Sequence, residues 1–113
     1  NTPLQALVTL NNDVFNEAAQ AMTRRVLSEA GTADRERLVY ALRLCIARNP
    51  DEHQLQSFGE LLTSARKYYQ ANPEDAAKAI HRHAVKNVKA VENAAWIATV
   101  RMIMNLDEFI VRE

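Results

Sequence analysis

Asp107 and Glu108 stand side by side near the end of the sequence, and a pair of carboxylates can act as general acid and general base. Adjacent side chains on a helix diverge by about 100°, so these two cannot converge on one reacting atom there. We therefore expect Asp107 to shape the end of the last helix. It can pair with a basic group or accept backbone hydrogen bonds from the first helix.

Histidine and cysteine are the residues that could hold a metal or a haem. His81 and His83 diverge by about 200° on a helix, and neither is spaced to converge with His53. Cys45 is the only cysteine, which excludes an internal disulfide, a thiolate zinc cluster and the attachment pattern of a c-type haem. We predict no metal or cofactor in this chain. Cys45, on the apolar side of its helix, is predicted to be a buried small hydrophobe.

A basic segment runs through residues 78–89, and a phosphate or nucleic-acid patch is one interpretation of it. Its members are Lys78, His81, Arg82, His83, Lys86 and Lys89. No aromatic residues interleave for base stacking, and the chain has zero net charge, with 14 basic and 14 acidic residues. We interpret the segment as a solvated linker and predict no nucleic-acid partner. No apolar run of membrane-spanning length is present, so no membrane partner is predicted.

Arg101 interrupts a nearly continuous apolar stretch and is the most unusual charged residue of the chain. A buried arginine needs a partner, so a structural ion pair is the preferred role and anion binding the other option. A possible polar cluster combines Arg101 with Asn1, Asn11 and Asp107.

The composition of the chain predicts the kind of fold that holds these residues. The chain has 113 residues, 48% of them hydrophobic and 25% charged, which suits one folded domain over residues 1–113. Only two glycines and three prolines punctuate it, which favours a few long helices over a many-turned β fold.

Cap signals and apolar spacing divide the chain into helices. Asp51 with Gln54 predicts a capping box, and Gly31 predicts a helix end. The expected segments are residues 3–10, about 13–30, about 34–49, 51–71, 73–80, and 90 to 105 or beyond.

The last helix is apolar on nearly every side, which is typical of a central helix, and Trp96 lies at its middle. We predict an all-α bundle or array of five to six helices with the C-terminal helix central. The short first helix needs an apolar partner, and we expect it to pack against the last helix. Deleting residues 1–10 is then expected to destabilise the whole domain.

The two ends of the chain resemble one family. The opening Asn-Thr-Pro-Leu-Gln-Ala-Leu (residues 1–7) and the closing Asn-Leu-Asp-Glu-Phe (residues 105–109) are similar to a planctomycete-specific C-terminal domain of unknown function. Internal blocks agree: Leu10-Asn11, Phe15, Glu17-Ala18-Ala19, Arg43-Leu44, Arg48-Asn49-Pro50, Glu52, Ala94-Ala95-Trp96 and Arg101. Asp13 stands where the family usually has proline. The family occurs in large proteins that often carry a cytochrome-c-like domain.

This resemblance implies an exported or periplasmic bacterial protein, of which the chain is the C-terminal fragment. It implies upstream domains as partners, haem possible in one of them, and no catalytic residues. The first functional hypothesis is a non-catalytic structural or interaction module. The alternative is part of a multidomain enzyme of redox or polysaccharide metabolism, with Asn1, Asn11, Arg101 and Asp107 facing the upstream chain.

Overall fold

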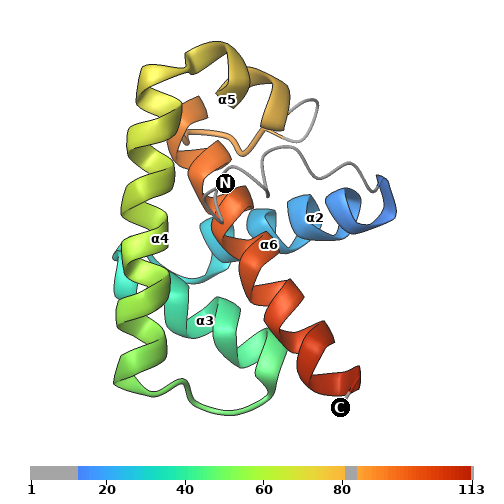
Figure 1. Ribbon diagram of the computed structural model, residues 1–113. Helices are drawn as coiled ribbons and strands as arrows, with labels where there is room; N and C mark the ends of the chain where they lie inside the picture. Colours follow the sequence, from blue (N-terminus) through green and yellow to red (C-terminus); the bar gives the residue numbers. More distant parts are fainter. Residues whose placement is uncertain (1–12, 81–83, 113) are drawn as a thin grey trace.

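The computed structural model describes residues 13–80 and 84–112, with side chains described from residue 15 to residue 105 outside the gap. These ranges hold five helices and no strand (Figure 1). They are α2 (Asp13–Glu29), α3 (Asp34–Ile46), α4 (Glu52–Ala71), α5 (Pro73–Ile80) and α6 (Ala90–Arg112). The all-α prediction is confirmed. The helix expected over residues 3–10, and its packing against the last helix, lie outside the described residues.

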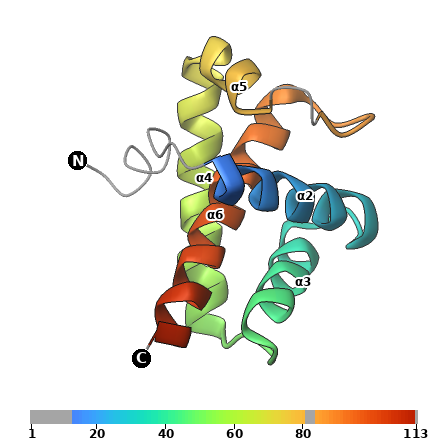
Figure 2. The same ribbon diagram turned by 90° about the vertical axis from the view of Figure 1, so that its right-hand side faces the viewer.

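Helix α6 is the centre of the fold, as its apolar sequence predicts. It crosses the molecule between α4 on one side and α2 and α3 on the other (Figures 1 and 2), and it contacts all four other helices. Every side chain from Asn93 to Arg101 is buried. Trp96 is the largest fully buried side chain, and Val100 and Ile103 extend the same core. A helix with neighbours on every side must be apolar on every side.

Local cap chemistry positions α4 and α5 as expected. The Asp51 carboxylate accepts a hydrogen bond from the Gln54 backbone N–H at 2.7 Å, and the Gln54 side chain accepts one from the Asp51 N–H at 3.0 Å. Pro73 opens α5, where a missing N–H costs nothing. Because the first residue of α4 is fixed in this way, the position of each polar side chain of α4 along α3 and α6 is fixed as well.

Helix α3 ends earlier than its sequence predicts. The expected stop was Asn49-Pro50, but the last helical residue is Ile46, and Ala47 adopts a left-handed conformation with φ of 56°. The Ala47 N–H still bonds to the Arg43 carbonyl at 3.0 Å. An alanine in this conformation carries no sequence signature, because glycine is the residue that usually occupies it. The shorter helix leaves Cys45 and Ile46 half-buried.

The spacing of apolar residues in α2 predicts a buried stripe of Phe15, Ala18, Ala19, Met22 and Val26, and the buried side of the helix is shifted from this stripe. Ala19 and Val26 are buried as expected, but Ala18 is exposed and Thr23 lies inside. Gly31, two residues past the helix end, has φ of 87°, which confirms its predicted role in ending the helix.

We expect Gly31→Ala to destabilise the protein by about 1–2 kcal/mol, because an L residue is strained in this left-handed conformation. The added Cβ would also lie 2.7 Å from Oε1 of Glu36, which accepts the Ala33 N–H. Gly59→Ala is the matched control. Gly59 lies inside α4, and a Cβ added there would be 3.9 Å from Cδ1 of Leu38, an ordinary contact, so alanine there is expected to stabilise by about 0.5–1 kcal/mol. Urea unfolding of both variants measures the sign and size of each change in the free energy of unfolding. Equal changes in the two variants would contradict the prediction.

Candidate functional site

The structure describes one member of the predicted polar cluster. Asn1 and Asn11 lie outside the described residues, as does the side chain of Asp107. Arg101 is 9% exposed and projects from the middle of α6. Its charge interacts with Tyr69 of α4, and burial lowers the pKa of Arg101 from its ordinary value. Burial also raises the pKa of Tyr69 to about 12, although the positive charge of Arg101 opposes the rise.

The other sequence candidates do not gather into one site. His81 and His83 lie outside the described residues, and His53 is exposed on α4. Cys45 is half-buried, not buried as predicted, because α3 ends just after it; its Sγ lies 3.5 Å from Sδ of Met22. Over the described ranges no three acidic, histidine or cysteine residues are grouped to hold a metal ion.

The part of the basic segment that the structure describes is solvated. Lys78, Lys86 and Lys89 are exposed, on the end of α5 and in the loop before α6. None of the helices in the described ranges is both long enough and apolar enough to cross a bilayer.

A polar cluster that was missed by sequence reasoning joins three helices. Arg66 of α4 forms two hydrogen bonds with each of two carboxylates. Its Nη1 and Nη2 donate to Asp34, the first residue of α3, both at 2.7 Å. Its Nε and Nη2 donate to Glu92, in the first turn of α6, at 2.7 and 2.6 Å. Both carboxylates lie in helix first turns, where the helix dipole favours negative charge.

The electrostatics of this Arg66 cluster follow from its geometry. Hydrogen bonds from Arg66 lower the pKa of Asp34 below its ordinary value, against a smaller opposing effect of burial. Hydrogen bonds to Asp34 and Glu92 raise the pKa of Arg66. The side chains of Arg66, Asp34 and Glu92 are 25%, 47% and 32% exposed. The cluster is therefore partly shielded from water, and its pairing energy is larger than that of a surface ion pair.

The lowered pKa of Asp34 predicts acid sensitivity. A carboxyl whose pKa is lower in the folded state stabilises the fold above its unfolded pKa of about 3.9, and that stability is lost as pH falls through the folded pKa. We expect the urea midpoint to fall between about pH 5 and pH 2. Asp34→Asn should show a smaller fall over the same range. Identical pH profiles of the two proteins would contradict the prediction.

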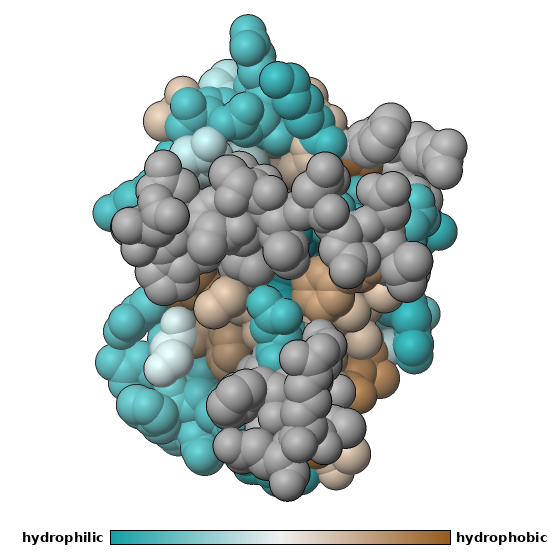
Figure 3. Space-filling view, turned by 45° about the vertical axis from the view of Figure 1, so that its right-hand side comes forward, coloured by the Kyte–Doolittle hydropathy of each residue, from teal (hydrophilic) through white to brown (hydrophobic). Residues whose placement is uncertain are grey.

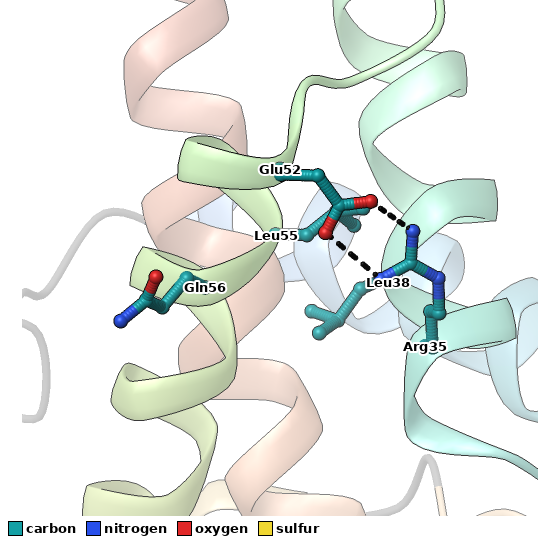
Figure 4. A pocket seen from close by; sticks show the side chains of 5 residues that line it. All are labelled: Arg35, Leu38, Glu52, Leu55 and Gln56. Atoms are coloured by element: carbon teal, nitrogen blue, oxygen red, sulfur yellow. Dashed lines mark hydrogen bonds and ion pairs between the residues drawn. The ribbon is translucent and has the colours of Figure 1, made fainter.

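An open hollow with a volume of about 330 Å³ lies between α3 and α4. Arg35 and Glu52 point toward each other across it and form two hydrogen bonds, Leu38 and Leu55 lie beside them, and Gln56 points away (Figure 4). Ligand sites measure about 300–1,000 Å³ and enclose most of the ligand. This hollow is at the lower limit and its two charged side chains are 63% and 77% exposed. It has the character of a solvated groove between helices.

A buried polar pair on α6 is the second feature that sequence reasoning missed. Asn93 is 1% exposed and Trp96 is fully buried. Neither amide atom of Asn93 nor Nε1 of Trp96 has a hydrogen-bond partner in the part of the chain that the structure describes. By contrast, the buried Thr99 hydroxyl donates to the Ala95 carbonyl of its own helix at 2.9 Å. An unpaired buried polar group costs about 1–3 kcal/mol, so this pair is costly to bury without a partner. The sequence feature that could have identified this pair is an amide side chain three residues before the tryptophan, inside an otherwise apolar helix.

Comparison with known proteins gives one match. A family model described as PSD1, Protein of unknown function (DUF1553), matches residues 1–62. The matched range is more than half of the 113 residues and takes in α2, α3 and the first half of α4. No curated protein and no solved structure matches the chain.

Proposed function

The chain belongs to the PSD1 family of proteins of unknown function, and we propose that it is a non-catalytic interaction module of a larger exported bacterial protein. In this proposal residues 1–113 are one domain at the C-terminus of the parent chain. The family resemblance of the two end motifs supports the planctomycete origin and the export. Haem, where the parent protein has it, belongs to an upstream domain.

The observation that carries this proposal is the Arg66 cluster. Arg66 forms two hydrogen bonds with each of Asp34 and Glu92, and these bonds join α3, α4 and α6. Arg35 and Glu52 similarly pair across the α3–α4 groove. Side chains engaged in this way hold helices at fixed positions and are not poised to act on a substrate. Their arrangement supports a rigid structural role.

The proposed partner is the upstream part of the same polypeptide. The face in Figure 3 shows hydrophobic side chains at the surface between hydrophilic margins. Half-buried apolar residues pack on the outside of the core, among them Met22, Ile46 and Met104. Surfaces of this mixed character are typical of contacts between domains of one chain.

The alternative is that the chain completes the active site of a multidomain enzyme of redox or polysaccharide metabolism. Arg101 favours it, because a largely buried arginine in an apolar helix is costly to maintain and such groups often serve function. In that case Asn1, Asn11 and Asp107 would join Arg101 at the boundary with the upstream chain.

Reconstitution from two pieces tests the proposal. The reading frame upstream of Asn1 is expressed without residues 1–113, and the 113-residue chain is added separately. We expect a 1:1 complex by light scattering and calorimetry, unaffected by Leu44→Ala on the exposed side of α3. Absence of a complex, or an upstream frame with no domain in it, would reject the interaction module. A complex that gains turnover which Arg101→Lys removes, with no loss of thermal stability, would instead support the enzyme alternative.

We also propose that the chain itself carries no metal or cofactor and has neither nucleic acid nor a membrane as its partner. Metal analysis of protein purified without an affinity metal should give less than one equivalent of zinc or iron. A full equivalent that is lost when His81 and His83 are both replaced by alanine would show that the segment after α5 is a metal site.

A further inference from the structure

We infer that Asn93 and Trp96 bind an internal water molecule within the first three turns of α6. Asn93 is 1% exposed and Trp96 is fully buried, so bulk solvent does not reach them. The described part of the chain supplies no hydrogen-bond partner for Oδ1 or Nδ2 of Asn93 or for Nε1 of Trp96. Buried polar groups of folded proteins are paired with protein or with ordered water in the great majority of cases.

The positions of the two residues on the helix fit one shared ligand. Residues three apart lie on one side of a helix, with their Cβ atoms about 5–6 Å apart. Long side chains on a helix lean toward its N-terminus, so an indole at position 96 is expected to lie over the turn that holds Asn93. Two of the three unpaired atoms are donors and one is an acceptor.

Water matches this set of atoms. Its oxygen can accept from the Trp96 indole N–H and the Asn93 amide N–H, and its own O–H can donate to Oδ1 of Asn93. A buried water typically makes about three hydrogen bonds. An anion would leave the amide acceptor unmatched, and a cation would be opposed by both donors. The polar pair therefore selects a small neutral molecule with both donor and acceptor capacity.

The indole proton of Trp96 provides a direct test, because the chain has one tryptophan and this proton gives one resolved NMR signal. In a water-selective nuclear Overhauser experiment on the full 113-residue chain, we expect a cross-peak to water with the sign of a long-lived, bound molecule. Asn93→Leu should abolish that cross-peak. Thr99→Val should keep it, because the Thr99 hydroxyl is satisfied by its own helix and this control removes any signal relayed through that hydroxyl.

A crystal structure of the unmodified chain keeps the inference testable if the Asn93 variant fails to fold. We expect an ordered water within about 3 Å of Nε1 of Trp96 and of one amide atom of Asn93. Density that shows no water there would overturn the inference. So would a cross-peak with the sign of fast-exchanging surface solvent, or one that Thr99→Val removes and Asn93→Leu leaves unchanged.

Discussion

Trp96→Ala is expected to lower the free energy of unfolding by about 3–5 kcal/mol, the usual cost of truncating a large core aromatic side chain. Trp96 is fully buried on the helix that contacts all the other described helices. Native proteins have about 5–15 kcal/mol of stability in total, so this loss is a large share of it and should lower the urea midpoint markedly. The loss is expected to be large because neighbours on several elements cannot all move into the space that the indole leaves.

Urea unfolding followed by far-ultraviolet circular dichroism measures this loss, because the variant lacks the tryptophan signal. Leu44→Ala is the matched control, since Leu44 is 38% exposed on α3 and its truncation should change the stability by less than about 1 kcal/mol. A Trp96→Ala midpoint within error of the Leu44→Ala midpoint would show that α6 does not organise the core.

Arg66→Leu is expected to destabilise by about 2–4 kcal/mol. Removing one member of a buried ion pair costs about 3–5 kcal/mol, and an exposed pair contributes about 0–1 kcal/mol. The side chain of Arg66 is 25% exposed, and two carboxylates lose their partner together. Asp34 and Glu92 would then repel each other with only solvent to screen them. Arg66→Lys should recover part of the loss, because it keeps the charge and loses the paired geometry of the guanidinium.

Arg35→Leu provides the comparison for this prediction. Arg35 also bridges two helices through a carboxylate, Glu52, but its side chain is 63% exposed. We expect a much smaller destabilisation for that variant, because solvent screens an exposed ion pair. If Arg35→Leu and Arg66→Leu proved equal in urea unfolding at low salt, partial burial of the Arg66 cluster would not be what makes it important.

The helices of this protein are largely predictable from local sequence. Asp51 with Gln54, Pro73 and Gly31 mark helix boundaries through interactions within a few residues, so the starts of α4 and α5 and the end of α2 are confirmed. The centrality of α6 is predictable for a related reason, because a helix that is apolar on all sides requires neighbours on all sides.

The end of α3 and the exposure of Cys45 were not predictable in this way. Ala47 ends the helix in a conformation that alanine rarely adopts, and no residue type marks it beforehand. Cys45 is half-buried and stands one residue before the last residue of this shortened helix, Ile46. Of the predicted polar cluster the structure places only Arg101, so the cluster as a whole stays a prediction.

What the sequence alone determined is therefore the presence of α2 to α6, the all-α class and the central helix, since these depend on contacts between near neighbours or on the polarity of one helix. The tertiary structure decided which polar groups meet. Asp34, Arg66 and Glu92 are separated by 32 and 26 residues, and each is unremarkable in its own helix. They converge because α3, α4 and α6 pack side by side, and the packing geometry that aligns three helices is not encoded in any one of them. For the same reason only the fold shows that Asn93, an ordinary amide in the sequence, is enclosed by the core.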